Sequence, residues 1–212
     1  QGLDNGLGRI NKYIFNVQRS CYTLIGGLSG SAKTTLVDFM LINALQDAEA
    51  KNIPINVFYY SFEINESRKK AMWMSALIYN KYNIIVKPET ISGFGDLRLT
   101  SRELELIDDL TPELDRLFNK IFWRWESMNP TGCYKEWWQF MEPRGTFLKE
   151  DYSDEFGHTK QRIINFLPSN PEEYNLIVMD HIALAKGERG FTLKDNLDKL
   201  SEYVVKVRNL FG

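Results

Sequence analysis

At 212 residues, the chain is long enough to bury one sizeable hydrophobic core, within a single domain or two small ones. Its formal net charge of −2 excludes a basic coat over the whole surface, although a local basic groove for nucleic acid stays open. No apolar run approaches membrane-spanning length, and Cys21 and Cys133 match no metal or disulfide pattern. We therefore expect a protein of a reducing, intracellular compartment that is not embedded in a membrane.

The first part of the chain alternates strand-like and helical patterns. Residues 21–26 are a short apolar run that ends in glycine, which predicts a strand, and residues 34–50 carry apolar side chains at helical spacing. Residues 55–61 follow Pro54 and are rich in β-branched and aromatic side chains, which predicts a buried strand. A helix is expected over 66–82.

The middle of the chain predicts an irregular stretch followed by two helices. Residues 83–99 contain proline and glycine at positions that break regular structure. Thr100 and Glu103 match a capping box, which opens a helix. Thr111 followed by Pro112 is typical of an N-cap and a first helical turn, so we expect a second helix to begin there.

The last part of the chain returns to alternation. Residues 121–127 predict a third strand, and a helix is expected after the Asn-Pro pair at 129–130. The polar stretch 149–157 predicts an exposed loop, whereas 175–184 is a continuous apolar run into an aspartate and predicts the clearest strand. A capping-box sequence at Thr192 opens the final helix. Such alternation predicts an α/β fold, with a mainly parallel sheet and helices on both faces.

A glycine-rich segment between the first expected strand and the first expected helix is similar to a phosphate-binding loop. The pattern of such loops is glycine, four residues, a second glycine, lysine, and serine or threonine. This chain fits the pattern except that Ala32 replaces the second glycine. The candidate nucleotide-binding residues are Gly27, Leu28, Ser29, Gly30, Ser31, Ala32, Lys33, Thr34 and Thr35.

The chemistry of a phosphate loop explains the residue types. Backbone N–H groups and a helix N-terminus surround the phosphates, Lys33 would add positive charge, and Thr34 would offer a hydroxyl to a metal ion. Ala32 is tolerable there if its φ is negative and costly if its φ is positive. The alternative interpretation is a glycine-serine turn beside a chance lysine.

Two acidic residues end the two clearest strands. Asp180 closes the apolar strand "LIVMD" and could hold Mg²⁺ directly or through water, or else merely cap the next turn. Glu63 follows the strand of 55–61 and could accept a proton from an attacking water molecule. The alternative is that Glu63 is simply a charged residue at a solvent-exposed strand end.

Three segments together resemble a known family. "GLSGSAKTT", "YYSFEIN" and "LIVMDHIAL", in this order and at these separations, resemble the RecA-like core of replicative hexameric helicases of the DnaB type, and "GLDNGLGRI" is similar to that family's entry segment. The resemblance spans residues 2–211. It implies one RecA-like P-loop NTPase domain over 1–212, with a partly helical insertion at about 83–120.

The resemblance also implies site roles and cofactors. The protein would hydrolyse ATP with Glu63 and Lys33 as catalytic residues. Thr34 and Asp180 would hold Mg²⁺. Ala32 departs from the family pattern, and so does His181, which stands where tyrosine is usual.

The implied partners are those of a replication motor. The protein would form a homo-oligomeric ring, a hexamer, on single-stranded DNA during DNA replication, with a loader or a primase as further partners. ATP would lie between subunits and be completed by an arginine of the neighbouring subunit. We expect that segment and a sensor glutamine to follow Gly212, so the chain would be incomplete at its C-terminus. A compact viral member would act in the host cytoplasm.

Basic residues follow the last strand. Lys186, Arg189 and Lys194 lie in a glycine-containing stretch that would face the channel of a ring and contact DNA phosphates. The alternative is an ordinary solvated loop. His181 could sense the γ-phosphate or simply pack, and the five tryptophans are expected in packing rather than base stacking.

Two other functions fit the same residues. The first is a RecA-like ATPase that does not unwind DNA: a recombinase, a clock-type ATPase or a loader. The second is a structural or regulatory protein that binds nucleotide but has lost hydrolysis, which the alanine at position 32 keeps open.

Overall fold

The computed structural model describes residues 2–9, 13, 16–94 and 97–212. Ile10 of the opening segment and Gly95 of the expected irregular stretch lie outside the described residues. The sequence predicts one domain, and the contacts of the structure group the chain into two compact units. The first unit comprises Gln1–Gln18, Ile25–Ser127 and Tyr174–His181, and the second comprises Arg19–Leu24, Met128–Glu173 and Ile182–Gly212.

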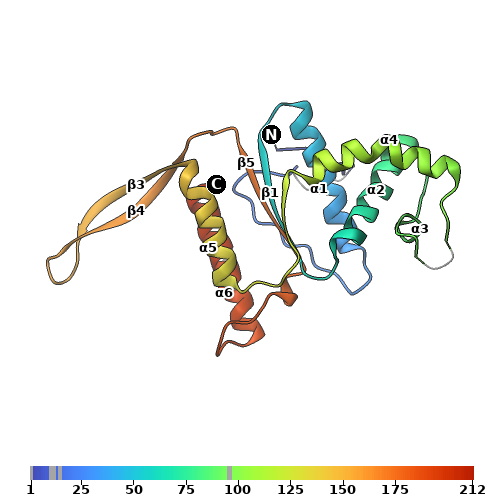
Figure 1. Cartoon of the computed structure of the whole chain (residues 1–212). Coiled ribbons are helices and arrows are strands. Elements are labelled where there is room, and N and C mark those ends of the chain that lie inside the picture. The colour runs from blue at the N-terminus through green and yellow to red at the C-terminus, as the bar shows by residue number, and fades with distance from the viewer. Residues whose placement is uncertain (1, 10–12, 14–15, 95–96) are drawn as a thin grey trace. The chain divides into compact units, whose positions relative to one another are not determined.

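The first unit is built on a three-stranded parallel sheet (Figure 1). Strand β1 (Ile55–Ser61) lies between β2 (Ile121–Arg124) and β5 (Tyr174–Asp180). Because the strands are parallel, their carboxyl ends meet at one edge, where Ser61 pairs with Asp180. The predicted α/β class and parallel sheet are thereby confirmed.

Three long helices share one core with this sheet. They are α1 (Lys33–Ala50), α2 (Glu66–Tyr82) and α4 (Ser101–Phe118), and the short α3 (Pro88–Ile91) precedes α4. Ile55, Val57 and Tyr59 of β1 point into this core, as the alternation of side chains along a strand requires. The core that these helices share lies on one face of the sheet. That helices cover both faces stays a prediction.

Helix α4 corrects the expectation of two separate helices. It continues through Pro112 without a break, and the hydroxyl of Thr111 donates to the carbonyl of Ile107 at 2.8 Å. Burial of an apolar stripe outweighs the hydrogen bond that proline removes. That stripe consists of Leu106, Leu110, Leu114 and Leu117. The segment expected as an insertion therefore contributes directly to the core.

The second unit pairs two helices that begin where the sequence predicts. In α5 (Pro130–Met141) the Asn129 side chain accepts from the third residue of the helix, and α6 (Leu193–Phe211) opens with a complete capping box. The rings of Tyr134 and Tyr203 stack between these helices at 4.4 Å. In the described part of the chain, no helix combines the length and apolar character needed to cross a membrane.

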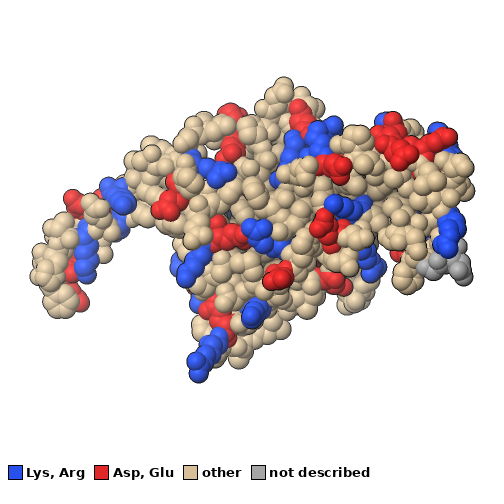
Figure 2. Space-filling view, viewed as in Figure 1, with Lys and Arg blue, Asp and Glu red and all other residues tan. Residues whose placement is uncertain are grey.

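The expectation of a loop over 149–157 is wrong, because most of this stretch belongs to an antiparallel ribbon. Strands β3 (Gly145–Ser153) and β4 (Thr159–Pro168) pair along their whole length. Polar side chains hold partners across the ribbon: Glu150 lies opposite Arg162 and forms an ion pair with it. Figure 2 shows acidic and basic side chains intermingled along this ribbon.

The strand expected over 21–26 is also absent from the structure. These described residues form no strand, and the side chains of Tyr22 and Leu24 are 40% and 73% exposed. A short apolar run needs burial and a partner strand before its backbone forms a ladder, and this run obtains neither among the described residues. The glycine-rich loop therefore follows an irregular segment rather than a strand.

Candidate functional site

The start of α1 and the ends of two strands bring predicted site residues together. The hydroxyl of Thr34 donates a hydrogen bond to Oδ2 of Asp180 at 2.8 Å. The backbone N–H of Phe62 donates to the carbonyl of Asp180 at 2.9 Å, which extends the β1–β5 pairing past Ser61. A residue of the glycine-rich segment and the strand-end aspartate thus meet at the carboxyl edge of a parallel sheet, where ligands bind in many α/β proteins.

The loop that precedes α1 is exposed, and the side chain of the first residue of α1 folds back onto it. Nζ of Lys33 donates to the carbonyls of Gly27 at 2.9 Å and Leu28 at 2.8 Å. A Cβ on Gly27 would lie 2.5 Å from Oγ of Ser31, so a side chain there would require the serine hydroxyl to move. Gly30 has a φ of 77°, a conformation that glycine adopts without strain.

Ala32 has a positive φ, the conformation that the sequence analysis expects to be costly for alanine. It precedes the first residue of α1 with φ 58° and ψ 28°, in the left-handed region. For a residue with a Cβ this conformation costs about 1–2 kcal/mol relative to the right-handed region. The position thus favours glycine, which the usual loop pattern has there.

Glu63 lies at the same edge but does not touch the other predicted residues. It is exposed, and it stands two positions after Ser61, the last residue of β1. Within the described chain, no hydrogen bond or ion pair joins its carboxylate to Lys33, Thr34 or Asp180. The structure therefore brings Thr34 and Asp180 into contact and leaves Glu63 nearby and open to solvent.

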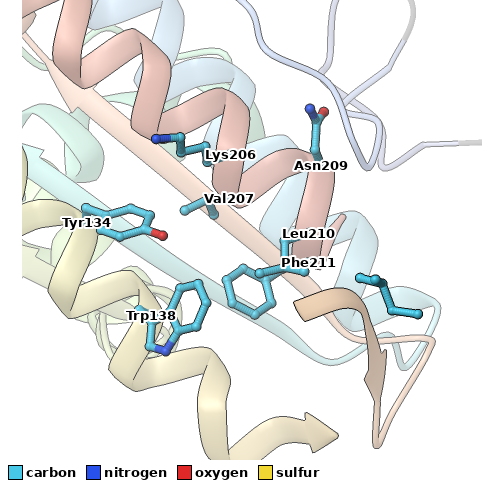
Figure 3. A pocket seen from close by; sticks show the side chains of 8 residues that line it. Tyr134, Trp138, Lys206, Val207, Asn209, Leu210 and Phe211 are labelled. Carbon is cyan, nitrogen blue, oxygen red and sulfur yellow. The ribbon is translucent and has the colours of Figure 1, made fainter. Parts of the chain in front are cut away.

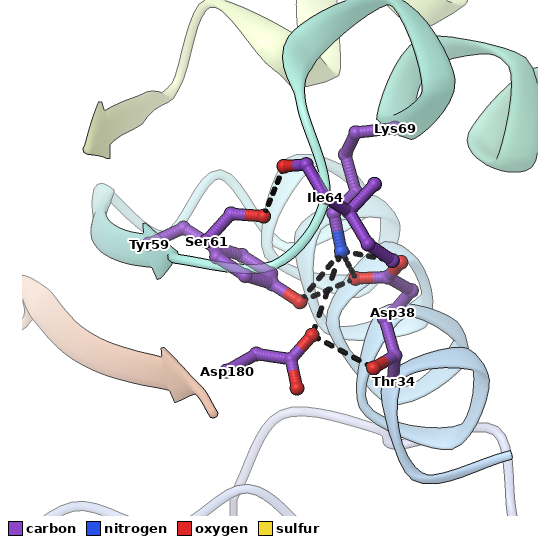
Figure 4. A network of polar contacts seen from close by, with 7 residues as sticks. All are labelled: Thr34, Asp38, Tyr59, Ser61, Ile64, Lys69 and Asp180. Atoms are coloured by element: carbon purple, nitrogen blue, oxygen red, sulfur yellow. Dashed lines mark hydrogen bonds and ion pairs between the residues drawn. The ribbon is translucent and has the colours of Figure 1, made fainter. Parts of the chain in front are cut away.

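A buried polar network behind Asp180 was missed by the sequence analysis (Figure 4). Nζ of Lys69 lies 3.2 Å and 3.0 Å from the two carboxylate oxygens of Asp38, and it donates to the hydroxyl of Tyr59 at 2.9 Å. The Tyr59 hydroxyl donates to Asp38 at 2.8 Å. Nζ of Lys69 is also 4.0 Å from Oδ2 of Asp180, the oxygen that accepts from Thr34. The network thus reaches the candidate site.

Burial governs the ionisation of this network. Loss of solvent raises the pKa of Asp38, although the charge of Lys69 and the hydrogen bonds from Tyr59 and Lys69 oppose that rise. Burial, and then the charges of Asp38 and Asp180, raise the pKa of Tyr59 well above its ordinary value. Tyr59 therefore keeps its proton and remains a hydrogen-bond donor.

Thr34 and Asp180 suit a hard divalent cation that is also bound by a phosphorylated ligand. Magnesium prefers oxygen donors and is commonly held by one or two protein groups, with phosphates and water completing its shell. Neighbouring ligands of an octahedral Mg²⁺ lie about 3 Å apart, close to the 2.8 Å between these two oxygens. The described residues contain no cluster of three or more histidine, cysteine or acidic side chains that would hold a metal without such a ligand.

The other candidate residues belong to different surroundings. Lys186, Arg189 and Lys194 are exposed residues of the second unit, and the backbone of Lys186 is fixed by a 3.0 Å hydrogen bond to the carbonyl of Met128. His181 is half-buried at the end of the first unit. Within the first unit, Trp73 is fully buried and Trp123 stacks on neighbouring rings, as expected for packing residues.

The second unit also contains a shallow cavity of about 350 Å³ between α5, α6 and the ribbon. Figure 3 shows the rings of Tyr134, Trp138 and Phe211 among the side chains that line it, together with the side chain of Lys206. Lys206 forms an ion pair with Glu202 at 3.0 Å. The lining contains none of the residues that the sequence singles out as a site.

Comparison with known proteins adds no relative. No protein-family model matches the chain, and no match was found among curated proteins or solved structures. The resemblance to DnaB-type helicases therefore rests on the sequence motifs alone.

Proposed function

We propose that the chain is the ATP-hydrolysing core of a DNA motor of the DnaB helicase type, with a RecA-like P-loop fold. The single observation that carries this proposal is the 2.8 Å hydrogen bond between Thr34 and Asp180. It joins two residues that are far apart in the sequence and that the two-motif interpretation expects on one metal ion. This contact supports the interpretation of both segments as parts of one nucleotide site.

The proposed reaction uses the residues at the sheet edge. The loop of residues 27–35 cradles the phosphates, and Lys33 turns from the loop carbonyls toward the terminal phosphate groups. Thr34 and Asp180 would hold Mg²⁺, which would supply positive charge against the phosphates. Glu63 accepts a proton as the oxygen of water attacks the γ-phosphorus and the bond to ADP breaks.

In its cell, such a motor works as a ring on single-stranded DNA. We propose a homo-oligomer, a hexamer, with ATP at the subunit interfaces and Lys186, Arg189 and Lys194 on the DNA phosphates. A loader or a primase would be a further partner. A RecA-like recombinase, clock-type ATPase or loader shares the site but would not unwind a duplex.

The strained Ala32 favours one alternative in particular. Alanine in a left-handed conformation departs from the usual phosphate-loop pattern and adds strain, which keeps open a protein that binds nucleotide but has lost hydrolysis. The hydroxyl and both acids of the proposed site are nevertheless present. Turnover decides between these functions.

The test compares ATP turnover and nucleotide binding in wild type and Glu63→Gln. We expect turnover by wild type and a loss of about 100-fold or more in the variant, with nucleotide affinity kept, because the amide cannot accept the proton. The matched control is Glu66→Gln, an exposed acid at the start of α2, which should turn over ATP like wild type. Equal rates for wild type and Glu63→Gln would remove Glu63 from its role, and binding without turnover in wild type would favour the alternative.

A further inference from the structure

The strongest unexplained feature of the first unit is a lysine with no solvent contact. The Lys69 side chain is 0% exposed, although burial of a cation is costly unless its charge and its donors are satisfied. Asp38 on α1 and Tyr59 on β1 satisfy it with contacts of 2.9–3.2 Å. These partners fix the ammonium group at one point between α1, α2 and the sheet.

That point lies beside the proposed metal-holding carboxylate. Nζ of Lys69 is 4.0 Å from Oδ2 of Asp180, so it attracts this oxygen without a direct hydrogen bond. The same oxygen accepts from Thr34 at 2.8 Å. The buried cation and the threonine hydroxyl therefore hold one carboxylate oxygen from two sides, as the dashed lines in Figure 4 show.

The charges explain how a lysine can serve a cation site. Asp38 balances the charge of Lys69 through two short contacts, so the negative charge of Asp180 remains for a metal ion. A lysine without that partner would compete with the metal for Asp180. The pair can thus orient the carboxylate while leaving it negative.

We propose that Lys69, anchored by Asp38 and Tyr59, is a positioning residue that holds Asp180 toward Thr34 for Mg²⁺. This inference rests on the proposed function. Lys69 does not touch the nucleotide or the metal; it acts through the Asp180 carboxylate. Partners behind a metal ligand commonly alter metal affinity by about 10- to 100-fold when they are removed.

A purely structural ion pair is the competing explanation, and a double variant separates the two. Lys69→Met alone leaves Asp38 buried without its partner and is expected to destabilise the fold. Asp38→Leu/Lys69→Met replaces the pair by apolar side chains of similar size, which buried pairs often tolerate. The double variant thus removes the attraction on Asp180 while keeping the core filled.

The experiment measures the affinity for a fluorescent ATP analogue over a range of Mg²⁺ concentrations, together with kcat. For the folded double variant we expect the Mg²⁺ concentration at half-maximal nucleotide binding to rise about tenfold. Tyr59→Phe, which keeps the ion pair but loses one anchor of Lys69, should raise it about threefold. The control Lys70→Met removes an exposed neighbour that pairs with Glu66, and it should leave this concentration unchanged.

The outcomes separate this inference from the proposed function. If wild type binds Mg²⁺-nucleotide and both the folded double variant and Tyr59→Phe keep its Mg²⁺ dependence, Lys69 is purely structural. If the double variant does not fold, the result for Tyr59→Phe decides alone. If wild type binds no Mg²⁺-nucleotide, the proposed function is wrong, and this inference, which rests on it, is wrong as well.

Discussion

The conformation of single residues sets the properties of the glycine-rich loop. Gly30 and Ala32 both have positive φ, but only glycine adopts this conformation freely. Ala32→Gly should therefore raise the free energy of unfolding by about 0.5–1 kcal/mol, since relief of the strained backbone exceeds the entropy that glycine adds to the unfolded chain. Urea titration followed by circular dichroism measures the change.

The control is an alanine with ordinary helical backbone, where substitution by glycine should change the free energy of unfolding in the opposite direction. Ala50 is an exposed residue in the last turn of α1, where glycine brings only its entropic cost. Ala50→Gly should lower the free energy of unfolding by about 0.5 kcal/mol. If both variants destabilise the protein equally, the left-handed conformation of Ala32 is not a source of strain.

One contact of the candidate site could be predicted from the sequence, and the buried ion pair behind it could not. The contact of Thr34 with Asp180 was foreseeable, because loop and strand-end motifs have fixed places at the edge of a parallel sheet. Lys69 and Asp38 were not foreseen, although each interrupts an apolar stripe of its helix. A polar residue in such a stripe signals a buried partner, but the sequence does not show which residue that partner is.

At the scale of elements, Glu188 links two helices of the second unit. Its carboxylate accepts from the backbone N–H of Thr131, at the start of α5, at 2.9 Å, and it pairs with Lys199 on α6. Its own N–H donates to Asn196 at 2.8 Å. The contacts of the carboxylate, led by the hydrogen bond from Lys199 and followed by those from Thr131, lower the pKa of Glu188 to about 2.

The lowered pKa of Glu188 predicts a pH-dependent contribution to stability. The folded state favours the carboxylate, so the stabilisation is complete above the ordinary pKa of 4.5 and is lost as the pH falls toward about 2. With solvent screening near the surface, Glu188→Gln should cost about 1–2 kcal/mol at about pH 7 and less than half of that at about pH 3. Urea titrations at both pH values measure the difference.

The control for this variant is Glu155→Gln. Glu155 is exposed in the turn of the β3–β4 ribbon and accepts no hydrogen bond within the described chain. We expect its free energy of unfolding to stay within about 0.5 kcal/mol of wild type at both pH values. A cost for Glu188→Gln that is the same at both pH values would mean that its carboxylate charge does not link the helices.

Elements differ in how far local sequence determines them. Helices α5 and α6 begin where their caps predict, because a cap is a contact between residues three positions apart. The ribbon and the continuous α4 were missed because distant partners decide them: Arg162 lies opposite Glu150, and the core buries Leu110 and Leu114 on either side of Pro112. The partner strand of the ribbon leaves no mark in a short window of sequence, whereas the leucines of α4 do stand at helical spacing, and only the Thr-Pro pair suggests a new helix start there.

At the scale of the whole molecule, the charge balance limits how DNA could be held. With a net charge of −2, the chain offers no general attraction for a polyanion, so binding must come from a local basic group. In the proposed motor this group is Lys186, Arg189 and Lys194. Its contribution is measurable because each phosphate contact releases counterions and adds to the salt dependence of binding.

Lys186→Ala/Arg189→Ala should weaken binding of single-stranded DNA at low salt. The plot of log affinity against log salt concentration should become shallower by about 1.4, since each phosphate contact on a single strand contributes about 0.7 to the slope. Fluorescence anisotropy of a labelled oligonucleotide, titrated at several salt concentrations, gives both values. The control Lys51→Ala/Arg102→Ala removes the same charge from exposed positions of the first unit and should leave the slope unchanged. If the slopes of both variants equal that of wild type, these residues belong to an ordinary solvated loop and the motor must hold DNA elsewhere.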